Sequence, residues 1–406
     1  MNRLEYAVTR TLLRLLGALF ALLGTRSDRV VLATARTSTL EGNLLHVFRA
    51  MRERRPNLDF VLLLEPYGYG LLAKLGYLLR AVRGMYYLRT SRLAVVDNAW
   101  LPVHVAPHPG TTVVQVWHAP GALKRFGLDT AVPGDGPEAQ FLHRNYDYVV
   151  TTSEASRVPW SRAFATPVER VLPLGTPRTD FFFDSDAMTA ARRRTLERFP
   201  ELAGRTVVLY APTFRGRGAA KHPAARLDAA RLRAMLPPSY ALVLKCHPNL
   251  NGQSESVDGF DVVADAATPL NELFTVADVL VTDYSSSIFE YALLHKPLVL
   301  LVGDLAEYER DPGLYVDYRT SMIGTQVATT DEVVAAIVER RFDLAGYDAF
   351  IARHLGEADG RASARFAERF LPTPADAGVA DTRGAIAARP ALERVGVAEG
   401  IASEPK

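Results

Sequence analysis

The 406-residue sequence lacks three features that commonly point to a function. It has one cysteine, Cys246, which excludes an internal disulfide framework and a cysteine-cluster metal site and indicates a reducing compartment. Its 47 basic and 45 acidic residues leave a net charge of +2, so we expect no partnership with nucleic acid. It also has no HExxH helix, no aspartates at metal-ligand spacing and no Walker-type glycine loop. We therefore expect chemistry that uses protein groups, without a metal or other cofactor.

The sequence also lacks an apolar run long enough to cross a bilayer. Its most apolar stretch, residues 12–23, is short and is interrupted by Arg14. The residues after this stretch make a poor signal-peptidase site, which argues against a secretory signal. We expect residues 1–28 to form an amphipathic helix on an anionic membrane surface, with arginines at its rim. The alternative is an ordinary first helix that is buried against the first domain.

What the sequence does contain is a series of short apolar runs that alternate with helical stretches. With 48% hydrophobic and 23% charged residues it is typical of a folded protein, and its length is too great for one ordinary core. The alternation predicts an α/β fold with two doubly wound parallel sheets. We expect these domains at residues 29–185 and 186–371, with a closing helix over residues 347–370. The Ala-, Pro- and Gly-rich residues 372–406 are expected to form a disordered tail.

Polar side chains directly follow many of the predicted strands. Ligands of open parallel sheets bind at the carboxyl ends of the strands, so these residues are candidates for a site. The hydroxyls and arginines of the second half suit a diphosphate, whereas a histidine in the first half suits deprotonation of an attacking hydroxyl. Two histidines each precede a proline-containing turn, which favours a function over a structural role. The strand-end residues are His118, Ser153, Arg178, Thr213, Arg215, Lys245, His247, Thr282, Ser285 and Ser286.

One stretch, residues 278–297, is predicted to form a strand, a turn and a helix, and a second strand over residues 297–302 follows it. Its turn carries three consecutive serines. Such a turn brings backbone N–H groups, hydroxyls and the positive end of a helix to one point, where an anion can be held without a cation. The alternative is that the serines only cap the helix. We assign Ser285 and Ser286 to a phosphate and Ser287 to the cap.

The order and spacing of these motifs resemble the CDP-glycerol glycerophosphotransferase family, the primases and polymerases of teichoic acid synthesis. The resemblance extends over about residues 30 to 370. The motifs that carry it are QVWHAPGALKRFG (115–127), TTSE (151–154), GTPRTD (175–180), YAPTFR (210–215), KCHPN (245–249), TDYSSSIFEYALLHKP (282–297) and DLAEYERDPGLYVDY (304–318).

The resemblance implies a GT-B-like fold, in which two Rossmann-like domains face one another across a cleft and the second holds most of the nucleotide. It implies a transferase that moves a polyol phosphate, in the first place glycerol phosphate, to a hydroxyl of a membrane-linked acceptor and releases CMP. The donor would be CDP-glycerol or CDP-ribitol, and the acceptor a lipid-linked saccharide or polyol phosphate. The product would be teichoic acid or a related wall or capsule polymer. The protein would be peripheral on the cytoplasmic face of the membrane.

The resemblance also assigns roles to individual residues. His118 matches the family's general base, and His247 matches a second histidine at the donor diphosphate. The sequence departs from the family in the loop after His118, which is one residue longer, and at Thr179, which replaces a common asparagine. Both departures bear on the identity of the acceptor. The expected substrate-binding residues are Lys124, Arg178, Thr213, Arg215, Thr282, Asp283, Ser285, Ser286 and Glu290.

Two other functions are compatible with the same sequence. A GT-B glycosyltransferase would use a nucleotide sugar, since a fold does not fix the function that it carries. A catalytically inert, membrane-associated scaffold would be consistent with the altered loop after His118.

Overall fold

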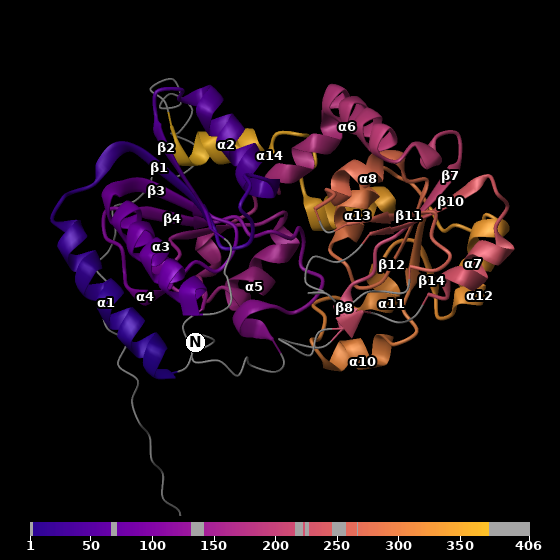
Figure 1. The fold of residues 1–406 in the computed structure, drawn as a ribbon, viewed down its shortest axis with the longest axis horizontal. Helices are drawn as coiled ribbons and strands as arrows, with labels where there is room; N and C mark the ends of the chain where they lie inside the picture. Colours follow the sequence, from indigo (N-terminus) through magenta and orange to yellow (C-terminus); the bar gives the residue numbers. More distant parts are fainter. Residues whose placement is uncertain are drawn as a thin grey trace, which may run out of the picture.

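The structure, a computed structural model, describes residues 3–65, 71–130, 142–215, 222–223, 227–245, 257–265 and 267–372. Two α/β bodies lie side by side, one built mainly from the first half of the chain and one from the second (Figure 1). This arrangement confirms the predicted α/β fold with two parallel sheets. The expected site residue His247 lies outside the described residues, as does the expected tail after residue 372.

The first domain is built around a six-stranded parallel sheet with the strand order β2-β1-β3-β4-β5-β6. Its strands are β1 (Arg26–Thr34), β2 (Asp59–Leu64), β3 (Ser91–Val96), β4 (Thr112–Gln115), β5 (Tyr148–Val150) and β6 (Val171–Leu172). Its helices are α1 (Arg3–Ala21), α2 (Gly42–Arg54), α3 (Leu71–Thr90), α4 (Leu101–Val105) and α5 (Glu154–Ala163), with the 3-10 turns η1 (Gly127–Asp129) and η3 (Val168–Arg170).

The strands of this sheet have unbroken apolar segments, as in residues 30–33 of β1 and residues 93–96 of β3, because helices cover both faces of the sheet. Successive residues of a strand point to opposite faces. Val31 and Ala33 of β1 therefore pack with α1, α3, α4 and α5, whereas Val30 and Leu32 pack with α2 on the other side. This double coverage is the physical reason that short unbroken apolar runs, rather than alternating ones, mark the strands in the sequence.

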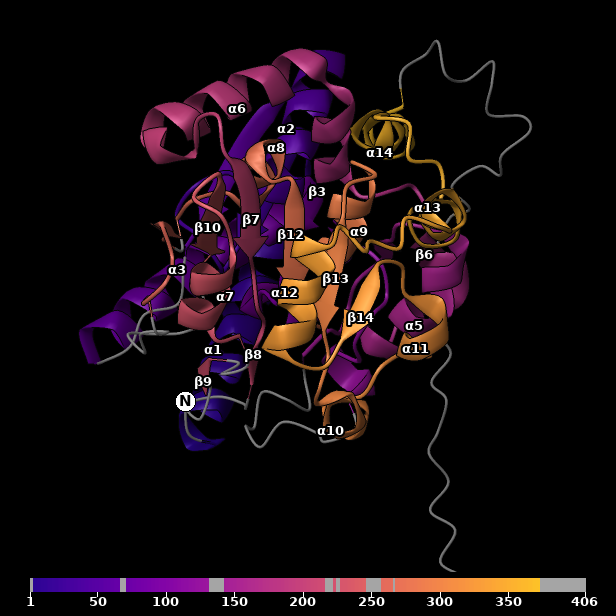
Figure 2. The same ribbon diagram turned by 90° about the vertical axis from the view of Figure 1, so that its right-hand side faces the viewer.

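The second domain repeats the plan, with the strand order β11-β10-β7-β12-β13-β14 (Figure 2). Its strands are β7 (Thr206–Tyr210), β10 (Tyr240–Lys245), β11 (Val262–Ala264), β12 (Val279–Thr282), β13 (Leu298–Leu301) and β14 (Thr325–Val327), and β8 (Phe214–Arg215) pairs separately with β9 (His222–Pro223). Its helices are α6 (Ser185–Arg198), α7 (Ala229–Met235), α8 (Leu270–Val276), α9 (Ser287–Ala292), α10 (Leu305–Arg310), α11 (Tyr318–Ser321), α12 (Thr330–Val338) and α13 (Tyr347–Leu355), with the 3-10 turn η5 (Pro200–Leu202).

The last helix, α14 (Ala362–Phe370), belongs to the first domain and not to the second. Phe366 and Phe370 complete the apolar layer that α2 forms on the first sheet, and Figure 1 shows α14 beside α2. The expected boundary at residue 371 therefore groups this helix with a domain on which it does not pack. The single helix expected over residues 347–370 is also broken, because Gly356 and Gly360 take positive φ angles of 66° and 77°.

The loop that follows β4 reaches from the first domain into the core of the second. Leu123 is 3% exposed and packs in the cluster formed by α8, α9 and α13. Backbone hydrogen bonds fix the loop there, from Arg125 N–H to the Gly313 carbonyl (2.9 Å) and from Tyr315 N–H to the Leu123 carbonyl (2.8 Å). A Cβ on Gly121 would lie 2.6 Å from the Phe289 ring, so only glycine fits this contact.

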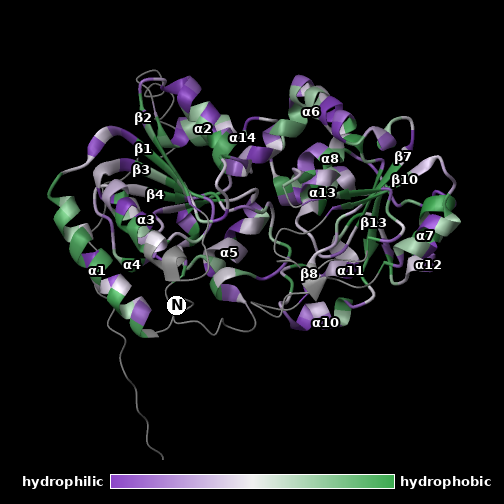
Figure 3. Cartoon of the chain, viewed as in Figure 1, coloured by the Kyte–Doolittle hydropathy of each residue, from purple (hydrophilic) through white to green (hydrophobic). Residues whose placement is uncertain are grey.

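Helix α1 has one packed side and one exposed side. Leu13 is fully buried against the first domain, and Gly17 lets α1 approach Met85 of α3 closely. Figure 3 shows that hydrophobic residues continue onto the outer surface of this helix. The exposed apolar residues are Leu4, Val8, Leu12, Leu15, Leu19, Leu22 and Leu23. Among the helices that the structure describes, none combines the length and the apolar character required to cross a membrane.

The placement of Leu123 generates a stability prediction. The change Leu123→Ala should lower the free energy of unfolding of the second domain by about 2–5 kcal/mol, because it leaves a cavity in that core. Leu128→Ala, in the same loop but at a residue that is 40% exposed, is the control, and its expected effect is within about 0.5 kcal/mol. Denaturant unfolding followed by circular dichroism measures both. Equal effects of the two changes would show that Leu123 does not serve the second core.

Candidate functional site

The candidate base His118 lies just beyond β4, on a loop with an unusual backbone conformation. Trp117, the residue before it, has a φ of 51°, in the left-handed region that bulky residues rarely adopt. The buried side chain of Asn43, at the start of α2, donates hydrogen bonds to the Val116 carbonyl (3.2 Å) and the Trp117 carbonyl (2.7 Å). The ring centroids of Trp117 and His118 are 4.1 Å apart. The two residues that precede His118 in the loop are therefore held in place.

The surroundings of His118 favour its neutral form. Burial lowers the pKa of this imidazole well below its usual value, and the positive charges of Arg36 and Arg178 lower it further. The backbone carbonyl of Asp97 raises the pKa, but its effect is the smaller one. A neutral imidazole near pH 7 has a free lone pair, so His118 can accept a proton from a substrate hydroxyl.

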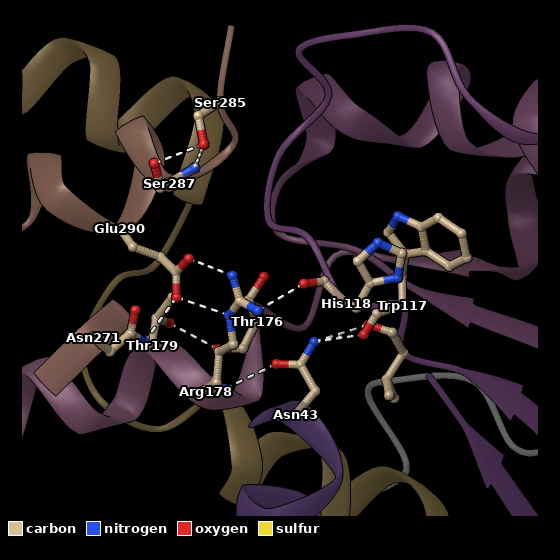
Figure 4. A network of polar contacts seen from close by, with 11 residues as sticks. Asn43, Trp117, His118, Thr176, Arg178, Thr179, Asn271, Ser285, Ser287 and Glu290 are labelled. Carbon is tan, nitrogen blue, oxygen red and sulfur yellow. Dashed lines mark hydrogen bonds and ion pairs between the residues drawn. The ribbon is translucent and has the colours of Figure 1, made fainter. Parts of the chain in front are cut away.

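Arg178 connects the His118 loop to the second domain (Figure 4). Its Nε donates to Glu290 Oε1 at 2.7 Å, and its Nη2 pairs with the second carboxylate oxygen. Its Nη1 donates to the backbone carbonyl of His118 at 2.6 Å, and its backbone N–H donates to Asn43 Oδ1 at 3.0 Å. Glu290, on α9, is 1% exposed and also accepts a hydrogen bond from Asn271 Nδ2 at 3.0 Å.

In the second domain, Asp283 brings together the predicted residues Thr213 and Arg215. Both the backbone N–H and the hydroxyl of Thr213 donate to its carboxylate at 2.9 Å, and Arg215 Nη1 lies 2.9 Å from Asp283 Oδ2. Arg215 Nε pairs with Asp304 as well, at 2.9 Å. Although burial opposes the charge, these two carboxylates raise the pKa of Arg215. The guanidinium is thus fully neutralised by aspartates of its own domain.

The serine turn is organised differently from the sequence-based expectation. The hydroxyl of Thr282 is buried and donates to the Ala211 carbonyl at 2.6 Å, so it links two strands. Ser285 Oγ accepts from the backbone N–H of Ser287 at 3.2 Å and from its hydroxyl at 2.7 Å, so Ser285 is the capping side chain and Ser287 begins α9. The half-buried hydroxyl of Ser286 has no hydrogen-bond partner in the described part of the chain. The assignment of Ser285 and Ser286 to a phosphate stays a prediction.

Two cations near His118 make no close ion pair with a carboxylate within the described residues. Lys124 Nζ contacts only the hydroxyl of Tyr308, at 3.5 Å. Arg36, two residues beyond β1, has no side-chain hydrogen bond or close ion pair there, although the carboxylates of Asp97 and Glu41 act on its charge. Sequence reasoning missed two residues of this region. Arg36 could have been found because it follows a predicted strand. Asn43 could have been found because it is a polar residue at the start of a helix whose buried face is otherwise apolar. Positive charge is therefore concentrated on the first-domain side of the interface.

Two other strand-end candidates make contacts that stabilise the fold. Lys245 Nζ donates to the Asp265 carbonyl at 2.6 Å, and Ser153 is buried ahead of α5.

The two departures from the family pattern lie at the contact between the domains. The longer loop is the one that carries Leu123 into the second core. The hydroxyl of Thr179 is buried and donates to the Thr176 carbonyl at 2.7 Å, within the 3-10 turn η4 (Pro177–Phe183).

The family model described as CDP-Glycerol:Poly(glycerophosphate) glycerophosphotransferase matches residues 16–371. The teichoic acid ribitol-phosphate primase of Bacillus spizizenii is 31% identical over 389 residues, which are 93% of this chain and 99% of that protein. The teichoic acid poly(ribitol-phosphate) polymerase of the same species is also 31% identical, over 91% of this chain, but the match spans only 60% of its length. The teichoic acid glycerol-phosphate primase of Bacillus subtilis is 27% identical over 77% of this chain and 80% of its own.

Solved structures resemble this chain over most of its length. The wall teichoic acid polymerase TagF superposes with a TM-score of 0.69 at 19% identity, covering 87% of this chain and 92% of the other. A UDP-GlcNAc 2-epimerase from Neisseria meningitidis gives 0.51 at 12% identity, covering 86% and 100%. At these identities the comparison concerns the fold alone, and it confirms the expected GT-B-like pair of Rossmann-like domains.

The titration of His118 tests this electrostatic environment. In two-dimensional NMR spectra of histidine-labelled protein, His118 should titrate well below pH 6.5, because burial and neighbouring cations disfavour the imidazolium. Arg36→Gln should shift this titration to higher pH, since it removes a positive charge. Arg52→Gln, on the exposed side of α2, is the control and should leave it unchanged. Titration of His118 at or above pH 6.5 would contradict the prediction.

Proposed function

The chain belongs to the CDP-glycerol:poly(glycerophosphate) glycerophosphotransferase family, and we propose that it moves a polyol phosphate from a CDP-activated donor to a hydroxyl of a membrane-linked acceptor. It is a transferase of teichoic acid synthesis, since the family model spans both domains and a primase matches along nearly its whole length. That match is the observation that carries the proposal. The acceptor is a lipid-linked saccharide or polyol phosphate.

His118 is the proposed general base. Its neutral imidazole accepts the proton of the acceptor hydroxyl as the oxygen attacks the β-phosphorus of the donor. The bond from the β-phosphorus to the bridging oxygen breaks, and CMP leaves with both electrons of that bond. The polyol phosphate is then joined to the acceptor by a phosphodiester, and His118 releases its proton to water.

The charge on the diphosphate is proposed to be met by Arg36 and Lys124 from the first domain and by Ser286 with the backbone of the serine turn. Lys124 reaches Tyr308, whose ring is stacked 3.8 Å from that of Tyr284 in the turn, so it lies beside the expected donor position. Arg215 is already neutralised by Asp283 and Asp304, so its proposed contribution is to hold the turn in place. His247 stays the predicted second histidine at the diphosphate.

The proposed donor of the polyol phosphate is one of two CDP-polyols. Glycerol phosphate is the sequence-based expectation for the transferred group. CDP-ribitol is the second candidate, because the ribitol-phosphate primase is 31% identical over 93% of the chain and the glycerol-phosphate primase 27% over 77%. The two donors differ in the length of the polyol and leave the same CMP.

The exposed row of α1 is proposed to hold the protein on the cytoplasmic face of the membrane, as a peripheral protein. Leu4, Val8, Leu15 and Leu19 lie at spacings of four and seven residues, which place them on one side of α1, and the exposed Leu22 follows just beyond its end. Each leucine that enters the lipid contributes about 1.5–3 kcal/mol. The row lies on the first domain, the domain that carries His118, so a membrane-linked acceptor would approach from that side.

Release of CMP tests the reaction. The purified protein with a lipid-linked acceptor should release CMP from CDP-glycerol or CDP-ribitol, and His118→Ala should slow this release by about 10²–10⁴-fold. The exposed His295 provides the control His295→Ala, with an unchanged rate. Turnover of UDP-sugars in place of both CDP-polyols would favour the nucleotide-sugar glycosyltransferase. A cellular role that survives His118→Ala would favour the inert scaffold.

Vesicle sedimentation tests the membrane surface. The double change Leu15→Asp/Leu19→Asp should abolish binding to vesicles of phosphatidylglycerol and phosphatidylcholine, because it places two charges in the lipid-facing row. The matched control is Met235→Asp on α7, also an exposed apolar residue but on the other domain. If both variants bind as the wild type does, α1 is not the membrane surface.

A further inference from the structure

Four side chains outside the reacting groups connect the His118 loop to the second domain: Asn43, Arg178, Asn271 and Glu290 (Figure 4). We call this set the domain clasp. We propose that the clasp positions His118 as a base, so that His118 is in place only when the two domains are closed on one another. This inference rests on the proposed function of His118 and assigns Arg178 and Glu290 a positioning role instead of substrate binding.

The clasp holds backbone atoms of the His118 loop itself. Asn43 Nδ2 binds the carbonyls of Val116 and Trp117, and Arg178 Nη1 binds the carbonyl of His118 at 2.6 Å. Three consecutive carbonyls are thus held by two side chains. Because Trp117 lies between them in a left-handed conformation, these hydrogen bonds fix a backbone that would otherwise relax.

The guanidinium of Arg178, which binds the His118 carbonyl, also binds the second domain. Arg178 makes a two-pronged contact with Glu290, through Nε at 2.7 Å and through Nη2. Asn271 of α8 donates to Glu290 Oε1, the oxygen that also accepts from Arg178 Nε, at 3.0 Å. One planar group therefore contacts both the His118 loop and α9.

The ion pair of Arg178 and Glu290 is poorly suited to bind a diphosphate. Glu290 neutralises Arg178, and its buried carboxylate would repel a phosphate that approached the pair. Lys124 contacts no carboxylate within the described residues, and Arg36 makes no close ion pair there although Asp97 and Glu41 act on its charge, so these two cations are the better phosphate ligands. The charge distribution thus separates anion binding from positioning.

Arg178 lies on η4, where the chain passes from the first domain to the second. Asn43 binds its backbone from the first domain, and two residues later Asp180 accepts the N–H groups of Ala362 and Ser363 at 2.9 and 2.8 Å. The first part of η4, as far as Asp180, is therefore anchored to the first domain, whereas Phe182 near its end packs in the second core and Glu290 moves with the second domain. Separation of the domains breaks the Arg178–Glu290 pair and frees the guanidinium to leave the His118 carbonyl.

Kinetics of three variants test the clasp in the CMP-release assay. Arg178→Gln and Glu290→Gln should each lower kcat by about 10²-fold with little change in the KM of the CDP-polyol, since misplacement of a base by about 1 Å has that effect. Arg178→Gln should also move the acid limb of the kcat profile to higher pH, because a positive charge near His118 is lost. The control Glu272→Gln, in an exposed pair with Arg194, should match the wild type. A rise in KM with unchanged kcat would instead identify the pair as donor ligands and overturn the proposal.

A double variant separates positioning from folding. Either single change leaves a buried group without its counter-charge and can destabilise the protein, whereas Arg178→Gln/Glu290→Gln removes both charges together. The double variant should recover thermal stability toward that of the wild type and keep the low kcat. If kcat recovers together with stability, the pair is merely structural.

Interdomain distance provides a measurement that does not depend on activity. Spin labels on cysteines introduced at Glu53 of α2 and Met235 of α7, in a Cys246→Ser background, report the separation of the domains by pulsed electron paramagnetic resonance. Glu290→Gln should broaden and lengthen this distance distribution, and Glu272→Gln should not. An unchanged distribution for Glu290→Gln would overturn the clasp even if the wild type turns over CDP-polyols. A lengthened one supports domain holding even if the wild type shows no turnover, an outcome that would refute the proposed function alone.

Discussion

One buried carboxylate lies at the centre of the polar contact between the two domains. Glu290 is 1% exposed, and a carboxylate in such a place is stable only when a cation and hydrogen-bond donors surround it. Arg178 supplies that cation from the first domain, and Asn271 supplies a further donor from the second. Because Arg178 also holds the His118 carbonyl, the same contact links the relative position of the domains to the geometry at the candidate base.

The distribution of charge divides the interface between the domains into two parts that differ in their ability to attract an anion. In the second domain Asp283 and Asp304 neutralise Arg215, so the turn before α9 is rigid and close to neutral. On the first-domain side Lys124 has no carboxylate partner within the described residues, and Arg36 interacts with Asp97 and Glu41 without forming a close ion pair there. An anionic substrate would therefore be drawn to the side where the imidazole is kept neutral by the same cations.

The sequence was a good guide to the sheets because both faces of each strand are buried, which produces unbroken apolar runs. It was also a good guide to the strand-end position of His118. It could not reveal that Thr282 gives its hydroxyl to the Ala211 carbonyl or that Ser285 is the cap of α9, because a serine or threonine that binds a phosphate and one that binds backbone have the same local sequence. Helix α14 packs on the first domain because its apolar residues contact those of α2, which lies far away in the sequence. The local sequence of α14 does not show which domain it packs on.

The position of α14 has a consequence for the order in which the protein can be completed. Phe366 and Phe370 close the apolar layer over β1 and α2, although more than 300 residues separate them from those elements along the chain. The first domain is therefore a discontinuous unit, and during synthesis its core stays open until the ribosome has passed the whole of the second domain. The second domain can finish folding first, and the first one is sealed afterwards by the last helix.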